Sequence, residues 1–314
     1  MLDFRMTTFL DLCETRSYTK TAERLHLTQP AVSQHIRHLE ESFGCKLFAY
    51  AAKTLSLTQK GERLREFAQS MRAGSDKMLR ILRSPENGRP FLTMGATLTI
   101  GEYVAPPILS AYLAERPQTD LCMYVNNTET LLKKLSRGEI DMALIEGTFQ
   151  KSDYAWQLFS REEFLPVCAP DSPYAAGSFT LDDLARSRII VREKGSGTRQ
   201  VLETLLSEHD LSLKDFAGMA EIGNFSAIKR LVADGIGVTF VYREVVRQEL
   251  CEGTLVPVRL EQVETSRDFH FVYLKHSAFE EEVLQVYDFF KSRRSESQKR
   301  LVQCSACSST RKDG

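Results

Sequence analysis

The chain has 314 residues, of which 42% are hydrophobic and 26% are charged, and its formal net charge is −1. This length and balance predict a globular protein of about two domains. No apolar stretch approaches the roughly 18 residues that cross a bilayer, and residues 1–16 lack the apolar core and cleavage site of a secretory signal. We therefore expect a cytoplasmic protein with no membrane partner.

The first helix is expected over Met6–Cys13 and the second over Thr19–Leu25. A third helix is expected to begin at Thr28, which is a good N-cap residue, with Pro30 in its first turn where a missing N–H costs nothing. Two short helices joined by a tight turn, at about residues 18–37, are typical of a helix-turn-helix.

The third helix has two different faces. Val32, Ile36, Leu39 and Phe43 recur at spacings of four, three and four, which places them on one apolar stripe. The opposite face is polar, and such side chains hydrogen-bond base edges or phosphates in DNA-reading helices. We therefore expect this helix to enter the major groove of double-stranded DNA. The predicted DNA-binding residues here are Thr28, Gln29, Pro30, Ser33, Gln34 and Arg37.

Charge is distributed unevenly along the chain. Residues 1–90 hold 15 Lys and Arg against 10 Asp and Glu, whereas the remainder holds 26 against 32. Such a split is typical of a polyanion-binding head on a mildly acidic body. Chance asymmetry explains the charge equally well by itself, and only its coincidence with the helix pair favours DNA binding.

Two short β-prone pieces, around Leu47-Phe48 and Leu55–Leu57, follow the third helix. They leave room for a small hairpin beside that helix, a wing that would bring Lys53 to a phosphate or into the minor groove. An ordinary surface loop is the alternative. With the wing, residues 1–58 form the predicted DNA-binding domain.

A long helix is predicted over Thr58–Arg83, because apolar or small residues recur there at alternating spacings of four and three. The seam consists of Leu64, Ala68, Met71, Ser75, Met78 and Leu82. The rest of the circumference is charged, so we interpret residues 59–87 as a dimerising linker helix with its hinge, the alternative being a plain core helix. Two prolines and a glycine in Ser84–Pro90 end the helix.

Strands and helices alternate after the hinge, which predicts parallel strands with crossover helices in an effector domain over residues 88–295. Two segments, Phe164–Ala169 and Phe269–Leu274, are expected to pass between two α/β subdomains, at about 91–161 with 268–295, and 162–267. The other predicted strands are Phe91–Ala96, Leu121–Val125, Met142–Ile145, Ile189–Val191 and Val238–Val241. Predicted helices cover Thr99–Glu115, Thr128–Arg137, a segment from Thr198, and Phe225–Ala233.

Polar residues follow the carboxyl ends of three predicted strands, the edge at which open α/β sheets bind ligands. Helices begin there, and their free N–H groups favour a small polar molecule, an anion among the candidates. Arg199 could add a charge-assisted contact. The alternative is that the threonines only cap helices. The predicted effector-binding residues are Thr97, Thr99, Asn127, Thr128, Ser196, Thr198 and Arg199.

Seven cysteines without framework spacing indicate free thiols in a reducing compartment. Cys304 and Cys307 form a CxxC, but no second pair accompanies them, and we expect residues 296–314 to be a disordered tail. We expect no metal and no cofactor. A thiol sensor made from Cys122, Cys168 or Cys251 is left open.

Enzyme motifs are missing from the sequence. Gly195-x-Gly197 lacks the third glycine of a dinucleotide fingerprint, and no GxxxxGK[ST], HExxH or GxSxG occurs. We therefore expect no catalytic residues and no enzyme. A hydrolase or transferase that uses the cleft is an alternative, which turnover of a cleft ligand would reveal. An architectural DNA-binding protein without ligand control is another, which predicts no thermal shift with any metabolite.

Over nearly its whole length the chain resembles LysR-type transcriptional regulators. The segments that carry the resemblance are Ser17–Ala22, Leu27–Ser33, Ile36–Glu40, Leu47-Phe48 and Leu57–Gly61. It implies an α/β fold class with an N-terminal winged helix-turn-helix, a coiled linker helix and an effector domain similar to periplasmic binding proteins. It also implies dimers or tetramers, promoter DNA and a small-molecule effector as partners, and leaves RNA polymerase open as a further partner.

Two local features refine the resemblance. The Gly195–Arg199 segment and the segment Gly223–Lys229 match the pattern of some family members, which adds Asn224 to the implied effector-binding residues. The wing departs from the pattern, since family members commonly carry arginine shortly after the Leu-Phe pair. This chain has Tyr50 there, and its nearest cation is Lys53.

Overall fold

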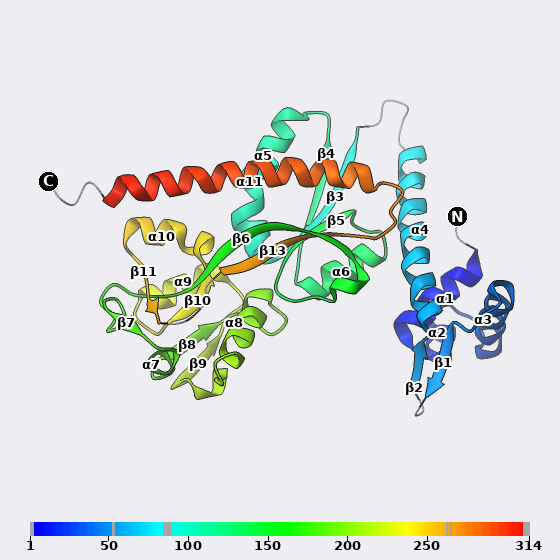
Figure 1. The fold of residues 1–314 in the computed structure, drawn as a ribbon, viewed down its shortest axis with the longest axis horizontal. Helices are drawn as coiled ribbons and strands as arrows, with labels where there is room; N and C mark the ends of the chain where they lie inside the picture. The colour runs from blue at the N-terminus through cyan, green and yellow to red at the C-terminus, as the bar shows by residue number, and fades with distance from the viewer. Residues whose placement is uncertain (1–2, 52–53, 84–88, 262, 264–265, 310–314) are drawn as a thin grey trace.

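The computed structural model describes residues 3–51, 54–83, 89–261, 263 and 266–309, with only the backbone described for Ala51 and residues 297–309. A small head, which contains the N-terminus, and an elongated body lie on either side of one long helix (Figure 1). The predicted fold class is confirmed: a helical head with a two-stranded hairpin is followed by a mixed α/β body.

The head consists of α1 (Phe4–Thr15), α2 (Tyr18–Arg24), α3 (Gln29–Phe43) and the antiparallel hairpin β1 (Phe48–Ala51) and β2 (Thr54–Leu57). Its core joins residues from α1, α3 and the hairpin, among them Phe9, Ile36 and Leu47. The Thr28 hydroxyl accepts a hydrogen bond from the Ala31 N–H at 3.3 Å, so the predicted cap of the third helix is confirmed.

The linker helix is α4 (Gln59–Arg83). It begins against the hairpin, where a Cβ at Gly61 would overlap the carbonyl oxygen of Leu47. The predicted seam divides into two parts. Ala68 is buried in the head core with Leu64 packed beside it, because α4 closes the base of its own head. The remaining large seam residues are exposed, and these are Met71, Met78 and Leu82.

Subdomain I holds the parallel strands β3 (Phe91–Ala96), β4 (Asp120–Val125) and β5 (Met142–Glu146), with β3 between the other two. The π-helical turn η1 (Ile100–Val104) leads into α5 (Ala105–Glu115), and α6 (Thr128–Ser136) follows β4. The carboxyl ends of these three parallel strands therefore meet at one edge of the sheet. The 3-10 turn η2 (Lys151–Asp153) follows β5.

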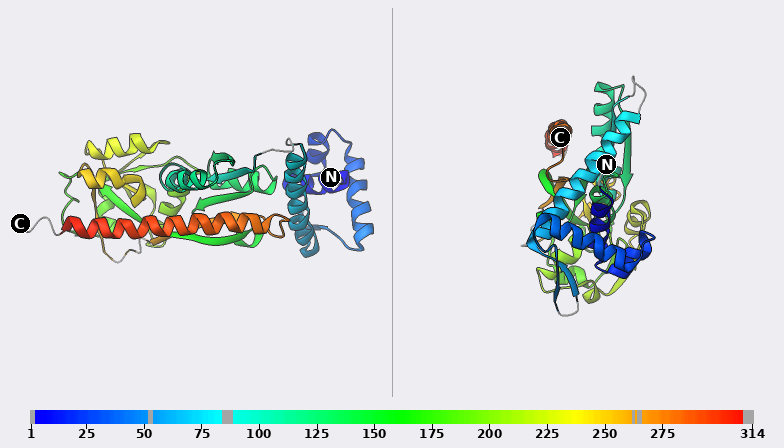
Figure 2. Two further views of the ribbon diagram at one scale, coloured as in Figure 1. Left: turned by 90° about the horizontal axis from the view of Figure 1, so that it is seen from above. Right: turned by 90° about the vertical axis from the view of Figure 1, so that its right-hand side faces the viewer.

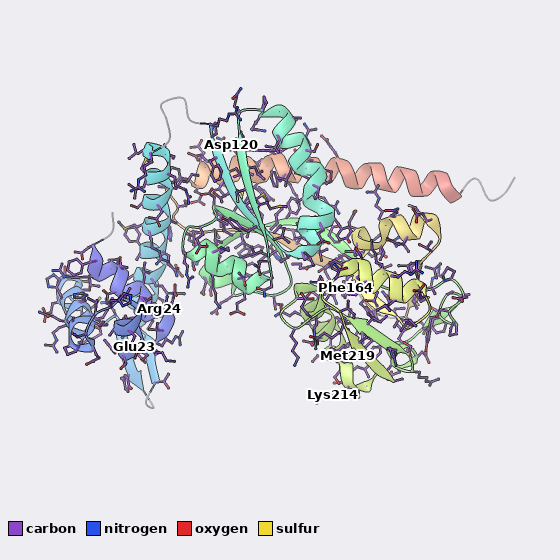
Figure 3. The ribbon with its side chains drawn as sticks, turned by 180° about the vertical axis from the view of Figure 1, so that it is seen from behind. Glu23, Arg24, Asp120, Phe164, Lys214 and Met219 are labelled. Atoms are coloured by element: carbon purple, nitrogen blue, oxygen red, sulfur yellow. The ribbon has the colours of Figure 1, made fainter. Side chains whose placement is uncertain are left out.

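Two long strands pass between the subdomains, β6 (Ala155–Cys168) and β13 (Ser266–Tyr273). From Phe164 onward, β6 leaves β13 and pairs with β10 (Thr239–Tyr242), and Figure 3 shows Phe164 at the meeting place of the subdomains. Here the purely parallel prediction is wrong: β13 runs antiparallel to both β5 and β6. The reason is that β6 carries the chain into subdomain II and β13 brings it back.

Subdomain II contains β8 (Arg188–Val191) parallel to β9 (Gly218–Glu221), with a parallel bridge from Ile189 to Val238 just before β10. Its main helices are α8 (Gly197–Ser207) and α9 (Phe225–Ala233). Shorter elements complete it: β7 (Ser178–Phe179), α7 (Leu181–Ala185), η3 (Leu213–Asp215), η4 (Arg243–Val246), α10 (Arg247–Glu252), β11 (Val256–Pro257) and β12 (Arg259–Leu260).

The last helix, α11 (Glu280–Ser309), lies alongside the body (Figure 2). Its backbone is helical through Ser309, which differs from the disordered tail predicted for residues 296–314, since extending a formed helix costs far less than nucleating one. Residues 310–314 and the Cys304 and Cys307 side chains lie outside the described part. Within the described ranges, no helix is both long enough and apolar enough to cross a membrane.

Candidate functional site: a DNA-facing helix and an inter-subdomain cleft

The polar side of α3 faces away from the head core. Val32, Ile36 and Leu39 are buried, and Ser33 is half-buried. Phe43, the last residue of the predicted stripe, is 49% exposed, so this part of the prediction is wrong: α3 ends at Phe43, beyond the residues that cover the stripe. The other predicted DNA-binding residues on described backbone are exposed, and these are Thr28, Gln29, Pro30, Gln34 and Arg37. Their side chains can therefore reach an external partner without any unfolding of the head. Lys53, the predicted wing contact, lies outside the described residues.

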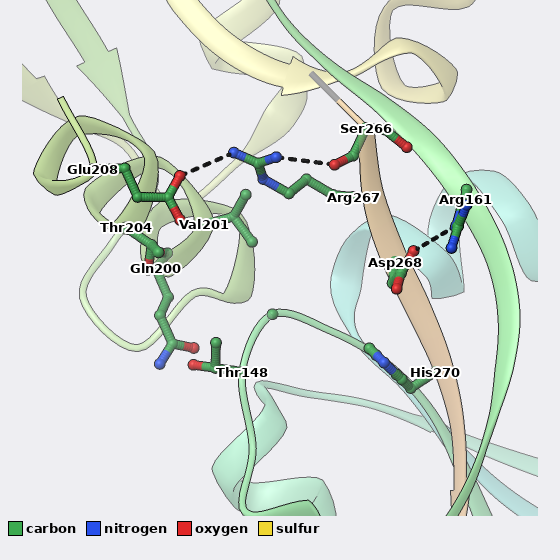
Figure 4. A pocket seen from close by; sticks show the side chains of 11 residues that line it. Thr148, Arg161, Gln200, Val201, Thr204, Glu208, Ser266, Arg267, Asp268 and His270 are labelled. Atoms are coloured by element: carbon green, nitrogen blue, oxygen red, sulfur yellow. Dashed lines mark hydrogen bonds and ion pairs between the residues drawn. The ribbon is translucent and has the colours of Figure 1, made fainter. Parts of the chain in front are cut away.

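The body is hollowed where its two subdomains meet. One pocket of about 500 Å³ is lined by Thr128, Lys194, Ser196 and Arg199, among others. A second pocket, of about 410 Å³, lies between α8 and the crossing strands (Figure 4). Both pockets share Thr148 and Gln200, whose side chains point toward each other in Figure 4. The two pockets are thus the two sides of one cleft.

Glu146, the last residue of β5, is buried behind the wall of this cleft, directly before Gly147 and Thr148, which line the pocket of Figure 4. Its Oε1 atom accepts a hydrogen bond from the Thr99 hydroxyl at 3.1 Å and another from the Thr198 hydroxyl at 3.2 Å. The two hydroxyl oxygens are also 3.1 Å apart. Since Thr99 belongs to subdomain I and Thr198 to subdomain II, the carboxyl group of Glu146 joins the subdomains.

Glu146 also lies against the first residue of α8. A Cβ built on Gly197 would be 2.7 Å from the Glu146 Cγ and 3.2 Å from its Oε1. This places the carboxyl group at the positive end of an 11-residue helix whose N-cap, Ser196, makes no side-chain capping bond. The chain itself therefore supplies a carboxyl group where an anionic ligand would be expected.

Burial raises the pKa of Glu146 from 4.5 to about 7, since removal from water disfavours the charged form. The hydrogen bonds from Thr99 and Thr198 and the positive charge of Arg192 act in the opposite direction. Burial is the largest of these effects. The carboxyl group therefore changes its protonation state near neutral pH.

Four buried polar atoms around the cleft centre have no hydrogen-bond partner within the described part of the chain. They are Glu146 Oε2, Thr97 Oγ1, Arg192 Nη1 and Tyr242 Oη. Arg192 and Tyr242 both interact electrostatically with Glu146. Unpaired buried groups are costly and rare in folded proteins. Arg192, Tyr242 and Glu146 therefore each keep a polar atom that a polar molecule could satisfy.

The side of the cleft shown in Figure 4 contains a buried histidine. His270 is packed edge-on between the rings of Phe149 and Trp156, at centroid distances of 5.3 and 5.4 Å. Burial and the nearby Lys151 lower its pKa. Nearby, Arg267 bonds to the Ser266 carbonyl and pairs with Glu208 (Figure 4). Both ring nitrogens of His270, in contrast, have no hydrogen-bond partner among the described residues.

Other predicted effector residues border the same cleft in supporting roles. Thr128 donates its hydroxyl to the Glu146 carbonyl at 3.2 Å. Asn127 caps α6 by accepting from the Thr130 N–H at 2.9 Å, and its amide nitrogen would be 3.4 Å from a Cβ at Gly195. The threonines at the cleft centre therefore bind the chain's own groups, beyond the helix capping that was the alternative.

Arg199, a predicted ligand contact, lines one pocket, and its charge is already paired. Its guanidinium pairs with Glu203 at 2.8 Å, with Glu221, and with the Arg192 carbonyl at 3.2 Å. Two carboxylates already neutralise it, because the turns of α8 and β9 bring acidic residues to its sides. Asn224 is exposed and caps α9 by accepting from the Ala227 N–H, outside the residues that line either pocket.

Comparison with known proteins assigns both the head and the body to known families of domains. Residues 5–62 match the family described as "Bacterial regulatory helix-turn-helix protein, lysR family", and residues 86–295 match "LysR substrate binding domain". The chain belongs to the LysR family of transcriptional regulators. As such it combines a DNA-binding head with an effector-binding body.

Three proteins illustrate how close the likeness to this LysR-type regulator is. The Escherichia coli K12 "Uncharacterized HTH-type transcriptional regulator YeiE" is 30% identical over 254 residues, 81% of this chain and 85% of that protein. An H2O2-bound cysteine-to-serine mutant of Corynebacterium glutamicum OxyR has a TM-score of 0.63 at 22% identity, covering 96% of this chain and 95% of that one. The Synechocystis CcmR regulatory domain in complex with 2-PG has a TM-score of 0.59 at 21% identity, covering 66% and 98%.

The sequence-based prediction of this LysR effector site missed Glu146 and Arg192. Each is a charged residue beside the carboxyl end of a buried strand, after the apolar runs Met142–Ile145 and Ile189–Val191. A charge directly after such a run, at the ligand-binding edge of the sheet, is the signal that could have found them.

Proposed function

We propose that this LysR-family regulator acts as a dimer whose two α3 helices enter successive major grooves of a partly palindromic promoter site. The orientation of α3 carries this proposal, because Gln29, Gln34 and Arg37 face solvent while most of its apolar stripe is buried. Amide and guanidinium groups there can form bidentate contacts with base edges. Thr28, Pro30 and Ser33 complete the proposed DNA surface. We infer that the protein acts in the cytoplasm, where the promoter lies.

The proposed dimer forms through α4. Phe67, Met71, Met78 and Leu82 are exposed along this helix at spacings of four, seven and four. Large apolar side chains at heptad-like spacing on one exposed helix face are typical of a coiled-coil seam. A second copy of α4 would bury them and would hold the two heads at a set distance. A tetramer built from two such dimers is compatible with the same seam.

A small molecule is proposed to bind in the cleft between the subdomains. The four unpartnered buried atoms there support this, as does the CcmR regulatory domain, whose structure holds 2-PG. The effector must bind one arrangement of the subdomains better than another, since otherwise no equilibrium shifts. Thr97, Thr99, Asn127, Thr128, Ser196 and Thr198 are the proposed effector-side residues, with Glu146 and Arg192 added.

The linker gives a physical route from cleft to head. Ser70 on α4 donates to the His276 carbonyl at 2.7 Å, and Arg72 donates to the Ser136 carbonyl at 2.9 Å. A movement of subdomain I therefore moves α4 directly. We infer that effector binding changes the spacing of the two heads and the bend of the DNA, which alters promoter affinity. Contact with RNA polymerase is a further proposed consequence.

We infer that the chain regulates and does not catalyse, in keeping with relatives that are named transcriptional regulators. Genome-wide mapping of bound sites, together with binding of the purified protein to the recovered fragments at two salt concentrations, tests the proposal. The expected result is a small set of promoters bound with strong salt dependence. Absence of any preference for a genomic fragment, or turnover of a cleft ligand, would contradict it.

A further inference from the structure

Several hydrogen-bond donors lie beside Glu146, where the two subdomains meet. The hydroxyls of Thr99 and Thr198 converge on one point at the N-terminus of α8. Arg192, 5% exposed, adds an Nη1 group with no partner in the described part of the protein. Hydroxyls, a helix N-terminus and a guanidinium together are the groups that bind oxyanions. These donors are suited to binding a small oxyanion. The one group among them that would repel an anion is the carboxyl group of Glu146.

That carboxyl group sets a condition on binding. An oxyanion beside an ionised Glu146 would place two negative charges together in a buried site, where their repulsion is strong. The charged and titratable groups that face Glu146 from packed elements are Arg192, after β8, and Tyr242, at the end of β10. Arg192 already neutralises Glu193 through two hydrogen bonds of 2.7 Å. Arg192, the cation that acts on Glu146 among the described residues, therefore has its charge already neutralised.

Protonation of Glu146 removes the conflict. The neutral carboxylic acid has an O–H to donate, and its Oε2 atom, which has no partner among the described residues, can carry that hydrogen toward the bound anion.

We propose that Glu146 couples the binding of a small oxyanion in this cleft to the uptake of one proton, an inference that rests on the effector site proposed above. The ionised protein, the anion and one proton combine into a complex in which Glu146 is neutral, so charge and atoms balance. The effector class is accordingly a compact oxyanion, and Glu146 determines the pH at which it is sensed.

The protonation equilibrium of Glu146 allows this coupling to act near neutral pH. Burial raises the pKa of Glu146 to about 7, so the proton is held by part of the population at neutral pH. A bound anion raises that pKa further. Binding affinity then falls as the pH rises above about 7, because the anion must first draw a proton onto the carboxyl group.

Isothermal titration with inorganic sulfate, whose charge stays constant between about pH 6 and 8, tests the proposal on the full chain. For the wild type we expect sulfate affinity to be about tenfold weaker at pH 8 than at pH 6. Titrations in buffers of different ionisation enthalpy should count close to one proton taken up per sulfate at pH 8. This proton count needs no variant and therefore does not depend on how a variant folds.

Two variants sharpen the test. Glu146→Gln is neutral at every pH, so its sulfate affinity should be the same within twofold at both pH values. Glu129→Gln, which changes an exposed carboxylate lining the same cleft, should keep the tenfold dependence. Sulfate binding without proton uptake in the wild type would overturn the inference, and so would failure of both wild type and Glu146→Gln to bind at pH 6. Promoter binding by the same preparations tests the proposed function separately.

Discussion

Gly197 and Glu146 pack so closely that the first residue of α8 has no room for a side chain. A Cβ at Gly197 would lie 2.7 Å from the Glu146 Cγ, well inside van der Waals contact. The glycine thus allows the helix N-terminus to approach the carboxyl group, which in turn accepts the Thr198 hydroxyl. Gly197 is therefore required by this close approach and not by an unusual backbone angle.

Gly197→Ala should therefore destabilise the body. The added methyl group overpacks the cleft centre, and we expect a loss of about 1–3 kcal/mol in the free energy of unfolding, measured by urea titration. Adding Glu146→Ala to the variant should restore part of the loss, because the two residues are in contact. Gly223→Ala is the matched control, since a Cβ there would make only ordinary contacts at 3.6 Å or more. Equal losses in both alanine variants would refute the packing argument.

The pKa of Glu146 predicts how stability depends on pH. Its value in the folded protein, about 7, exceeds its ordinary value of 4.5, so the folded state binds the proton more tightly. Below about pH 4.5 Glu146 is protonated in both the folded and the unfolded state, so it adds no pH dependence to the free energy of unfolding there. Between about pH 4.5 and 7 the free energy of unfolding falls as pH rises, by about 3 kcal/mol in total. Thermal melts of wild type and Glu146→Gln from pH 5 to 8 should differ in slope, and parallel curves would disprove the assignment.

The orientation of α3 predicts which contacts carry sequence information. Gln34→Ala or Arg37→Ala should cost about 1–3 kcal/mol in binding to a specific promoter fragment if the residue reads a base. Ser42→Ala, at the exposed far end of the same helix, should leave affinity unchanged. Fluorescence anisotropy with specific and random duplexes measures both effects. An equal loss on random DNA would assign that residue to the phosphate backbone.

The exposed stripe of α4 predicts a variant that separates the dimer. Met71→Glu places a charge in the proposed seam, and we expect the dissociation constant of the dimer to rise by at least about tenfold, since an unpaired charge cannot be buried there. Asp76→Lys, an exposed charge change on another side of α4, should leave assembly intact. Sedimentation equilibrium measures the mass of each. If Met71→Glu leaves the dissociation constant of the dimer unchanged, the interface does not lie on this face of α4.

A buried ion pair attaches α11 to the crossing strand. Arg294 bonds to Glu162 at 3.0 and 2.6 Å and to Glu244 at 2.9 Å, and both Arg294 and Glu162 are buried. Arg294→Ala should cost about 3–5 kcal/mol, because it leaves buried carboxylates without their cation. Arg293→Ala, the more exposed neighbour, should cost much less, because water screens its ion pairs. Chemical denaturation compares the two, and equal costs would contradict the role assigned to burial.

The sequence by itself determined what depends on neighbours along the chain. The Thr28 cap, the apolar stripe of α3 and the glycines and prolines at element ends act within a few residues, so spacing alone predicts them. The positions at which strands of the body end follow from the alternation of strands and helices along the chain. These patterns, with the segments shared by LysR-type regulators, indicated both the DNA-facing helix and the approximate place of the cleft.

Only the tertiary structure decided which groups meet inside that cleft. Glu146 and Thr198 are 52 positions apart, and Arg199 meets Glu221 only because β9 lies beside β8. The return of the chain through β13 likewise reverses a strand direction that local alternation cannot show. Burial, charge pairing and the pKa of a carboxyl group depend on everything within several ångströms, and folding, not spacing, sets that surrounding.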